Sequence, residues 1–180
     1  DFHTLVASIH PAVLVDARMK KHEIPEIQLT LAPFTVGLGP NFIAGETVHA
    51  AVETGWNDGL GKVLWQGATR PLEGEPQTIA GHARDRYVYA PVAGVFRTAC
   101  RIGDRVTAGQ TIATIEDSIL NAPISGIIRG LTHDGVPVAV KAKVIEVDPR
   151  GDPLNTVGIA ERPRRIARGV LEAVRQKNPL

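Results

Sequence analysis

An internal repeat of 32 residues constrains the fold of this chain more than any other feature. Residues 90–95 read Ala-Pro-Val-Ala-Gly-Val, and residues 122–127 read Ala-Pro-Ile-Ser-Gly-Ile. The match continues without a gap over about thirty positions, and it pairs Gly103 with Gly135, Val106 with Val138, Ile112 with Val144 and Ile115 with Val147. A repeat of this length indicates two copies of one supersecondary unit that stabilise each other.

Each copy predicts short β-strands separated by tight turns. After Ala-Pro comes a Gly that lets the chain bend, then a short apolar strand, a Gly-Asp or Asp-Gly turn, and an alternating strand such as residues 110–115. A single hairpin is marginal in water because it buries only one thin face. We therefore expect the two copies to pack face to face as a small antiparallel β domain.

The order of these motifs, Ala-Pro-x-x-Gly and then Gly-Asp-x-Val-x-x-Gly-Gln-x-Ile, resembles that of the biotinyl and lipoyl carrier family over residues 87–148. The resemblance implies a barrel-sandwich hybrid fold. In those carriers a Lys at the turn between the two halves holds the prosthetic group. Here the joining turn, residues 116–121, contains no Lys, and Lys141 and Lys143 come late in the second copy. We therefore expect the fold without biotin or lipoate.

Charge and composition exclude several classes of function. Twenty basic and nineteen acidic residues give a net charge of +1, which argues against a nucleic-acid or anionic-membrane surface. Aromatic residues make up only 4%, which argues against stacking of single-stranded nucleic acid. The chain has no long apolar run or signal peptide, and its lone Cys100 forms neither an internal disulfide nor a Cys-based zinc site. These features predict a cytoplasmic protein without a metal site.

Residues 1–67 predict the end portion of an α/β, Rossmann-like domain. A helix from Phe2 precedes a wholly apolar strand at residues 12–15, a pattern typical of a parallel strand buried on both faces. Asp16 and Arg18 follow this strand, and in open α/β sheets the carboxyl ends of the strands face the ligand crevice. The two residues are therefore either ligand contacts or an ion pair that terminates the strand.

A glycine-rich loop at residues 37–45 follows a second predicted strand at residues 35–38. Exposed backbone N–H groups in such a loop can hold an anion, and glycine permits a close approach. The spacing matches neither the Rossmann fingerprint nor the P-loop, so a tight structural turn is the alternative. The loop contributes four candidate cofactor-binding residues: Gly37, Gly39, Asn41 and Gly45.

His49 and Glu53 complete the candidate cofactor-binding residues. They stand four residues apart and share a face if residues 46–53 form a helix, whereas a twisted strand is the alternative. Two such residues without a third do not make a metal site. A His that is hydrogen-bonded within the fold or faces solvent is the other interpretation of His49.

The remaining boundaries follow from composition. A polar, Pro-rich linker is predicted at residues 68–86, the repeat domain at 87–150 and a C-terminal helical segment at 151–180. The helix is expected at residues 163–176, with Pro163 in its first turn and four apolar residues on one face: Ile166, Val170, Leu171 and Val174. Its arginines predict a solvated basic face or, alternatively, a surface for an anion or a partner protein.

Taken in order, several motifs resemble the YqeB family, described as an accessory of selenium-dependent molybdenum hydroxylase systems. These motifs lie at residues 15–19, 37–45, 48–54, 60–63, 147–150 and 169–173, together with the two Ala-Pro repeats. The resemblance covers nearly the full chain. Members of the family usually begin with a Rossmann-like segment bearing Gly-Ala-Gly-Asp, which is absent here, so we expect a truncated or processed product.

The resemblance implies a role in maturing or supplying a molybdopterin-type nucleotide cofactor, with a molybdenum hydroxylase or other maturation factors as partners. Two other interpretations stay open: a protein-interaction adaptor built on the lipoyl-like domain, and an enzyme that acts on a nucleotide or pterin through the polar candidate residues. No catalytic constellation is identifiable in the sequence. A homo-oligomer is compatible with all three interpretations.

Overall fold

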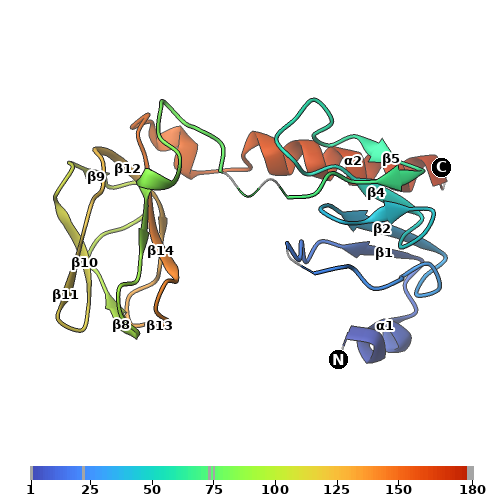
Figure 1. The fold of residues 1–180 in the computed structure, drawn as a ribbon, viewed down its shortest axis with the longest axis horizontal. Helices are drawn as coiled ribbons and strands as arrows, with labels where there is room; N and C mark the ends of the chain where they lie inside the picture. The colour runs from blue at the N-terminus through green and yellow to red at the C-terminus, as the bar shows by residue number, and fades with distance from the viewer. Residues whose placement is uncertain (1, 22, 73, 75, 178–180) are drawn as a thin grey trace. The chain divides into compact units, whose positions relative to one another are not determined.

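The computed structural model describes the chain except for residues 1, 22, 73, 75 and 178–180. The described residues form a mixed α/β structure that consists mostly of β-strands (Figure 1). They divide into two compact units: unit 1 comprises residues 1–74 and 159–180, and unit 2 comprises residues 75–158. Within the described part of the chain, no helix has the length and apolar character needed to span a membrane.

Unit 1 is built from two helices and six short strands. In chain order they are α1 (Phe2–Ile9), β1 (Val13–Asp16), β2 (Phe34–Leu38), β3 (Ile43–Ala44), β4 (Ala50–Val52), β5 (Val63–Leu64), β6 (Gly67–Ala68) and α2 (Glu161–Lys177). The main sheet has the order β1-β2-β4-β5, in which β1, β2 and β4 are parallel and β5 is antiparallel. Strands β3 and β6 form a separate antiparallel pair.

The fully buried strands of the main sheet in unit 1 are β2 and β4, whereas β1 is only partly buried. All five residues of β2 are buried, because the strand lies between β1 and β4. Strand β1 is at the edge of the sheet, and Val15 in it is 38% exposed. The prediction of a strand buried on both faces was therefore wrong for the strand after α1, since an apolar composition alone does not distinguish an edge strand from a central one.

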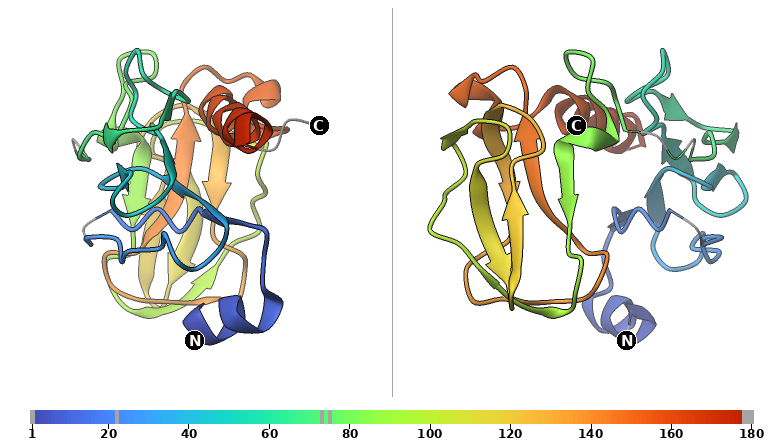
Figure 2. Two further views of the ribbon diagram at one scale, coloured as in Figure 1. Left: turned by 90° about the vertical axis from the view of Figure 1, so that its right-hand side faces the viewer. Right: turned by 60° about the vertical axis from the view of Figure 1, so that its left-hand side comes forward.

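Helix α2 packs against β2, β4 and β5 of the same unit. Figure 2 (left) views this helix nearly along its axis. Its buried residues are Ile166, Gly169 and Ala173, while Leu171 is 48% exposed. The predicted apolar face was therefore wrong at Leu171. The helix lies close to the backbone of Gly61 at Gly169, where an added Cβ atom would lie 2.3 Å from the Gly61 carbonyl oxygen.

Unit 2 contains the repeat. Its elements are the 3₁₀ turns η1 (Arg84–Arg86) and η2 (Pro153–Thr156) and the strands β7 (Tyr87–Tyr89), β8 (Gly94–Arg97), β9 (Arg105–Val106), β10 (Thr111–Ile115), β11 (Ser118–Asn121), β12 (Gly126–Leu131), β13 (Pro137–Val138) and β14 (Lys143–Asp148). They form two four-stranded antiparallel sheets, with the orders β11-β10-β8-β13 and β7-β14-β12-β9.

The two sheets of unit 2 are related by the repeat. Adding or subtracting 32 residues converts β7, β14, β12 and β9 into β11, β10, β8 and β13, so the two strand orders correspond position by position. One core joins the sheets and contains Phe96, Ile115, Ile128 and Val147, one residue from each of the four central strands. The copies do not form one sheet each, because β9 pairs with β12 of the second copy and β13 pairs with β8 of the first.

The compact units differ in extent from the predicted segments. Residues 68–72 and 74 of the predicted linker are counted with unit 1 and residues 76–86 with unit 2, while residues 73 and 75 lie outside the described part. The C-terminal helix is counted with unit 1 because its buried face contributes to the core of that unit. The last residues of the predicted C-terminal segment, 178–180, also lie outside the described part.

Candidate functional site

Asp16 ends β1 and is almost completely buried, with 4% of its surface exposed. The Arg18 guanidinium binds both of its carboxylate oxygens, with Nη2 2.5 Å from Oδ2 and Nε 3.0 Å from Oδ1. The Gln28 side chain donates a third hydrogen bond of 2.6 Å to Oδ2. Burial acts to raise the pKa of Asp16, but the hydrogen bonds from Arg18 and Gln28 outweigh it and hold the pKa below its ordinary value. Asp16 is therefore an internal anion with occupied oxygens.

Arg18 links this carboxylate to two further groups. Its Nη2 also lies 2.6 Å from Glu26 Oε1, and its guanidinium carbon lies 4.2 Å from the centre of the Phe2 ring. The bond from Arg18 lowers the pKa of Glu26, and the two carboxylates raise the pKa of Arg18. Of the two alternatives for Asp16 and Arg18, the contacts fit an ion pair that terminates the strand.

The glycine-rich loop is packed closely by Phe42 within it and by Thr69 after β6. An added Cβ atom at Gly37 would lie 2.3 Å from Cγ of Phe42, and one at Gly39 would lie 3.0 Å from Cβ of Thr69. The backbone N–H of Gly39 donates to the carbonyl of Val52 at 3.0 Å. Packing therefore excludes a side chain at Gly37 and leaves little space for one at Gly39. Gly45, by contrast, has open space around it and a φ of 86°, a backbone conformation that favours glycine.

A Gly37→Ala substitution tests this packing role. We expect it to lower the free energy of unfolding by about 2 kcal/mol, because the methyl group overlaps the buried Phe42 ring. Chemical unfolding of the variant measures the loss. In a Phe42→Leu background the same substitution should cost clearly less, because the ring that it meets is gone. An equal loss in both backgrounds would contradict the role assigned to Gly37.

Asn41 connects the glycine-rich loop to the preceding segment. Its φ is 71°, a left-handed conformation that Asn tolerates better than most residues. Its side-chain Nδ2 donates to the carbonyl oxygen of Glu23 at 3.2 Å. Asn41 therefore has a role within the fold.

His49 and Glu53 lie at opposite ends of β4, and the helical alternative for residues 46–53 was wrong. Four residues of extended chain place them about 13 Å apart, since a strand rises about 3.3 Å per residue. The Nδ1 of His49 accepts a 3.1 Å hydrogen bond from the backbone N–H of Thr35, so the neutral ring carries its hydrogen on Nε2. Among the described residues, no group of three or more His, Cys, Asp and Glu side chains is placed to hold a metal ion.

Glu53 is a buried carboxylate whose bonds are internal. Its Oε1 accepts from the backbone N–H groups of Thr54 and Gly55 at 2.8 and 2.7 Å, and its Oε2 accepts from Arg70 N at 2.8 Å. Only 5% of the residue is exposed. Glu53 therefore fastens the turn after β4 to the segment after β6.

The sheet register shows which candidates are neighbours. Asp16 is opposite Gly37, and Gly37 is opposite Ala51, so the carboxyl ends of the three parallel strands form one edge. Gly39 bonds Val52 at this edge, and Glu53 follows directly. His49 lies instead at the opposite end of β4, where its N–H donates to Thr35 O at 3.1 Å. The predicted site is thus divided between two edges of the sheet.

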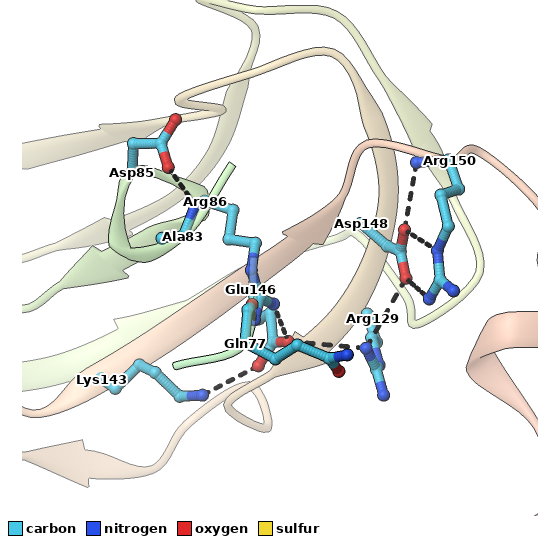
Figure 3. A network of polar contacts seen from close by, with 9 residues as sticks. All are labelled: Gln77, Ala83, Asp85, Arg86, Arg129, Lys143, Glu146, Asp148 and Arg150. Carbon is cyan, nitrogen blue, oxygen red and sulfur yellow. Dashed lines mark hydrogen bonds and ion pairs between the residues drawn. The ribbon is translucent and has the colours of Figure 1, made fainter. Parts of the chain in front are cut away.

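A charged network in unit 2 escaped the sequence analysis (Figure 3). Glu146 lies on β14 within contact distance of three cations: Arg86 Nη1, Lys143 Nζ at 2.8 Å and Arg129 Nη1 at 4.0 Å. Burial acts to raise the pKa of Glu146, but the bonds from Lys143 and Arg86 outweigh it and hold the pKa below its ordinary value. The available sequence signal was a carboxylate between apolar residues in the strand Lys-Val-Ile-Glu-Val-Asp.

Asp148 is the second carboxylate of the network and has no exposed surface. Arg150 binds it through the backbone N at 3.0 Å, Nε at 2.9 Å and Nη2 at 2.6 Å, and Arg129 Nη1 lies 3.6 Å from its Oδ2. The hydrogen bonds from Arg150 lower the pKa of Asp148 more than burial raises it. Asp148 therefore holds the Arg150 side chain in one orientation.

A comparison with known proteins places this geometry in context. No protein-family profile matches the chain. The chain is 36% identical over 171 residues to a protein of Escherichia coli (strain K12) named "Uncharacterized protein YqeB". The match covers 95% of this chain and 31% of that relative, so the chain spans about a third of the relative's length. The similarity to this relative runs through both units of the chain.

Proposed function

We propose that the chain is part of an accessory or maturation protein of a molybdenum hydroxylase system, and that it binds a molybdopterin-type cofactor or the apo-enzyme. The observation that carries this proposal is the ordered set of motifs between residues 15 and 173 that resembles the YqeB family. The similarity to YqeB supports the family assignment on which the proposal rests. Such a role implies a cytoplasmic location and contact with a hydroxylase or other maturation factors.

The polar candidate residues of unit 1 are hydrogen-bonded within the fold, which favours a binding role over catalysis. The carboxylate oxygens of Asp16 and Glu53 are occupied by hydrogen bonds within the fold. His49 uses Nδ1 for Thr35 and lies at the opposite edge of the sheet from Asp16. A general acid or base needs a reachable proton near the reacting group, which an internally bonded carboxylate does not offer.

The finer fold assignments belong to the same proposal. We regard unit 1 as part of a Rossmann-like α/β domain, because its first three paired strands are parallel and α2 covers the sheet. We regard unit 2 as a barrel-sandwich hybrid, because two repeat-related sheets enclose one core.

The second candidate function is a protein-interaction adaptor built on unit 2. The observation in its favour is the turn between β10 and β11, where carrier domains hold their modified Lys. The joining turn predicted at residues 116–121 is shorter in the structure, because Ser118–Asn121 form β11. The turn consists of Glu116 and Asp117, and Glu116 Oε1 accepts from the backbone N–H of Val95 at 3.1 Å. Because this turn is tied to β8 and has no Lys, unit 2 would act through its surface instead of a swinging group.

Gene deletion in the native host tests the main proposal. We expect molybdenum hydroxylase activity to fall to background and to return when the full-length gene is restored. A molybdenum enzyme of another class in the same cells serves as the control and should keep its activity. Unchanged hydroxylase activity and unchanged cofactor content in the deletion strain would overturn the proposal.

Cofactor analysis of the purified protein separates the two candidates. The protein is denatured, the released material is oxidised and tested for pterin fluorescence, and molybdenum is counted by elemental mass spectrometry. Stoichiometric pterin would support cofactor binding. The adaptor would be supported instead by two results together. Deletion abolishes hydroxylase activity, and the purified protein contains no pterin but co-purifies with the hydroxylase.

A further inference from the structure

A groove in unit 2 brings two arginines together at one end of the two-sheet structure. Its volume is about 430 Å³, and its polar lining includes Arg105, Thr107, Gln110, Ser125 and Arg150. The Arg105 guanidinium reaches across to the turn after β14, where its Nη1 lies 3.2 Å from the position of an ideal Cβ on Gly151. Gly151 has no side chain and a φ of 65°, so the turn leaves room for this guanidinium.

The Arg150 side chain is already oriented for a ligand. The buried Asp148 binds its Nε and Nη2, which leaves Nη1 without a partner among the described residues. Ser125 Oγ accepts from the backbone N–H of Ala108 at 2.9 Å, so its hydroxyl hydrogen is available for donation. Gln110 Oε1 likewise accepts from Thr107 N at 3.1 Å, and its amide NH₂ group is available. The groove thus presents several donors.

The acidic neighbours of the groove each accept hydrogen bonds from other groups of the fold. Asp148 is shared by Arg129 and Arg150, and Asp152, which faces Arg150, accepts from Leu154 N at 2.9 Å. Asp104 next to Arg105 accepts from Arg101 N at 2.8 Å. Arg105 itself forms no ion pair within the described part of the chain. The Arg105 guanidinium is therefore not held by a carboxylate, and it lies beside an oriented second guanidinium.

The repeat supplies an internal comparison for this groove. At an offset of 32 residues, the polar lining residues correspond to uncharged and mostly apolar ones: Arg105 to Pro137, Thr107 to Ala139, Gln110 to Ala142, Ser125 to Ala93 and Arg150 to Ser118. Four of the five pairs lie at equivalent places around β9 and β13 or before β8 and β12, whereas Arg150 follows β14 and Ser118 begins β11. At those four places the fold does not require a polar residue. Glycines that the fold needs, such as Gly94 and Gly126, occur at both positions. The polar residues are therefore specific to one end of unit 2.

We propose that this groove binds a phosphate group through Arg105 and Arg150, assisted by the Ser125 hydroxyl and the Gln110 amide. Guanidinium groups match phosphate oxygens in charge and geometry. The donors approach from both copies of the repeat, which suits a tetrahedral anion better than a planar carboxylate. The site does not depend on the function proposed above, because it rests on unit 2 alone.

Titration of the ¹⁵N-labelled 180-residue chain with inorganic phosphate tests the site. We expect saturable shifts of the backbone amides of Gln110, Gly126 and Gly151, and smaller shifts with acetate at the same ionic strength. Arg105→Ala and Arg150→Ala should each raise the dissociation constant by at least about five-fold, since each removes one charged donor. A nucleoside diphosphate is titrated in parallel. If it binds more tightly than inorganic phosphate, the site takes the phosphate of a larger ligand, and if it binds more weakly, the site takes free phosphate.

Arg101→Ala is the matched control, because Arg101 is equally exposed in the preceding turn but does not line the groove. It should leave the dissociation constant unchanged. The proposal would be overturned if Arg101→Ala weakened phosphate binding as much as the groove variants do. It would also be overturned if phosphate shifted only amides outside the groove. The circular dichroism spectrum of each variant verifies that unit 2 is folded during the titration. Should Arg150→Ala disturb the fold through Asp148, Arg105→Ala alone decides the outcome.

Discussion

Gly169→Val should unfold unit 1 more readily than any other single substitution considered for this chain. An added Cβ at position 169 would lie 2.3 Å from the carbonyl oxygen of Gly61 and 2.9 Å from Cγ1 of Val52. The facing residue is also a glycine with little space, because a Cβ on Gly61 would lie 2.6 Å from the Arg165 carbonyl oxygen. Two backbones are thus in contact, and neither can move as easily as a side chain.

The expected loss is about 3 kcal/mol or more in the free energy of unfolding, at the upper end of the cost of overpacking. The helix must shift away from β4 and β5 to admit the valine, and it then loses contacts of Ile166 and Ala173. Urea unfolding followed by circular dichroism and by Trp fluorescence measures the loss. Both Trp residues, Trp56 and Trp65, lie in unit 1, so fluorescence reports on this unit.

Arg168→Val is the matched control for this substitution. It introduces the same β-branched residue at the neighbouring position, which is exposed on the same helix. Its cost should be within about 1 kcal/mol, as expected from helix propensity alone. If the two variants lose equal stability, the close approach of Gly169 to Gly61 is not what holds α2 on the sheet.

The sequence allowed the main elements of unit 2 to be predicted because the repeat makes every strand appear twice. A glycine, an apolar alternation and a turn at matching offsets are strong local signals, and they led to two packed sheets with a common core. The exchange of β9 and β13 between the copies was not predictable in this way. It depends on pairing between strands far apart in the chain, which local patterns do not encode.

Unit 1 was harder to predict because its strands are short and its helices pack through few residues. Residues 46–53 contain apolar residues at spacings that fit both a helix and a strand, and the wrong alternative would have brought His49 close to Glu53. The contact at Gly169 was missed for a related reason. Hydrophobic periodicity finds side chains that bury themselves, but it does not find the position where a side chain must be absent.

The candidate site shows the same limit. Asp16 and Arg18 were recognised because they follow an apolar strand, and they do lie at the carboxyl edge of the sheet. The cluster of Arg105, Asp148 and Arg150 was overlooked because Arg105 precedes the other two by about forty residues, and local patterns do not show that they meet. The repeat itself contained the signal, since Arg150 and Arg105 stand where the other copy has Ser118 and Pro137.

Asp148→Asn should cost about 3 kcal/mol in the free energy of unfolding at pH 7, since a hydrogen bond to a charged group contributes about 1.5–3 kcal/mol. Asp148 is fully buried and accepts three hydrogen bonds from Arg150, with Arg129 beside it. An amide of the same shape lacks the charge that these donors need. Chemical unfolding followed by far-ultraviolet circular dichroism measures the effect, and the exposed turn residue offers a control, Asp117→Asn, which should change stability by less than about 0.5 kcal/mol.

The pH dependence of this loss distinguishes the charge of Asp148 from its shape. In the folded protein its pKa lies below the ordinary value, because Arg150 stabilises the carboxylate. The stabilisation is therefore fully present above the unfolded-state pKa of about 3.9 and is lost as the pH falls through the folded-state value. Asp16 titrates in both proteins and cancels in the difference, whereas Glu146 shares Arg129 with Asp148 and cancels only in part. The difference in the free energy of unfolding between wild type and Asp148→Asn should accordingly be constant from pH 7 to 5 and become smaller below about pH 4. A difference that stays constant at low pH would show that Asp148 contributes packing and not charge.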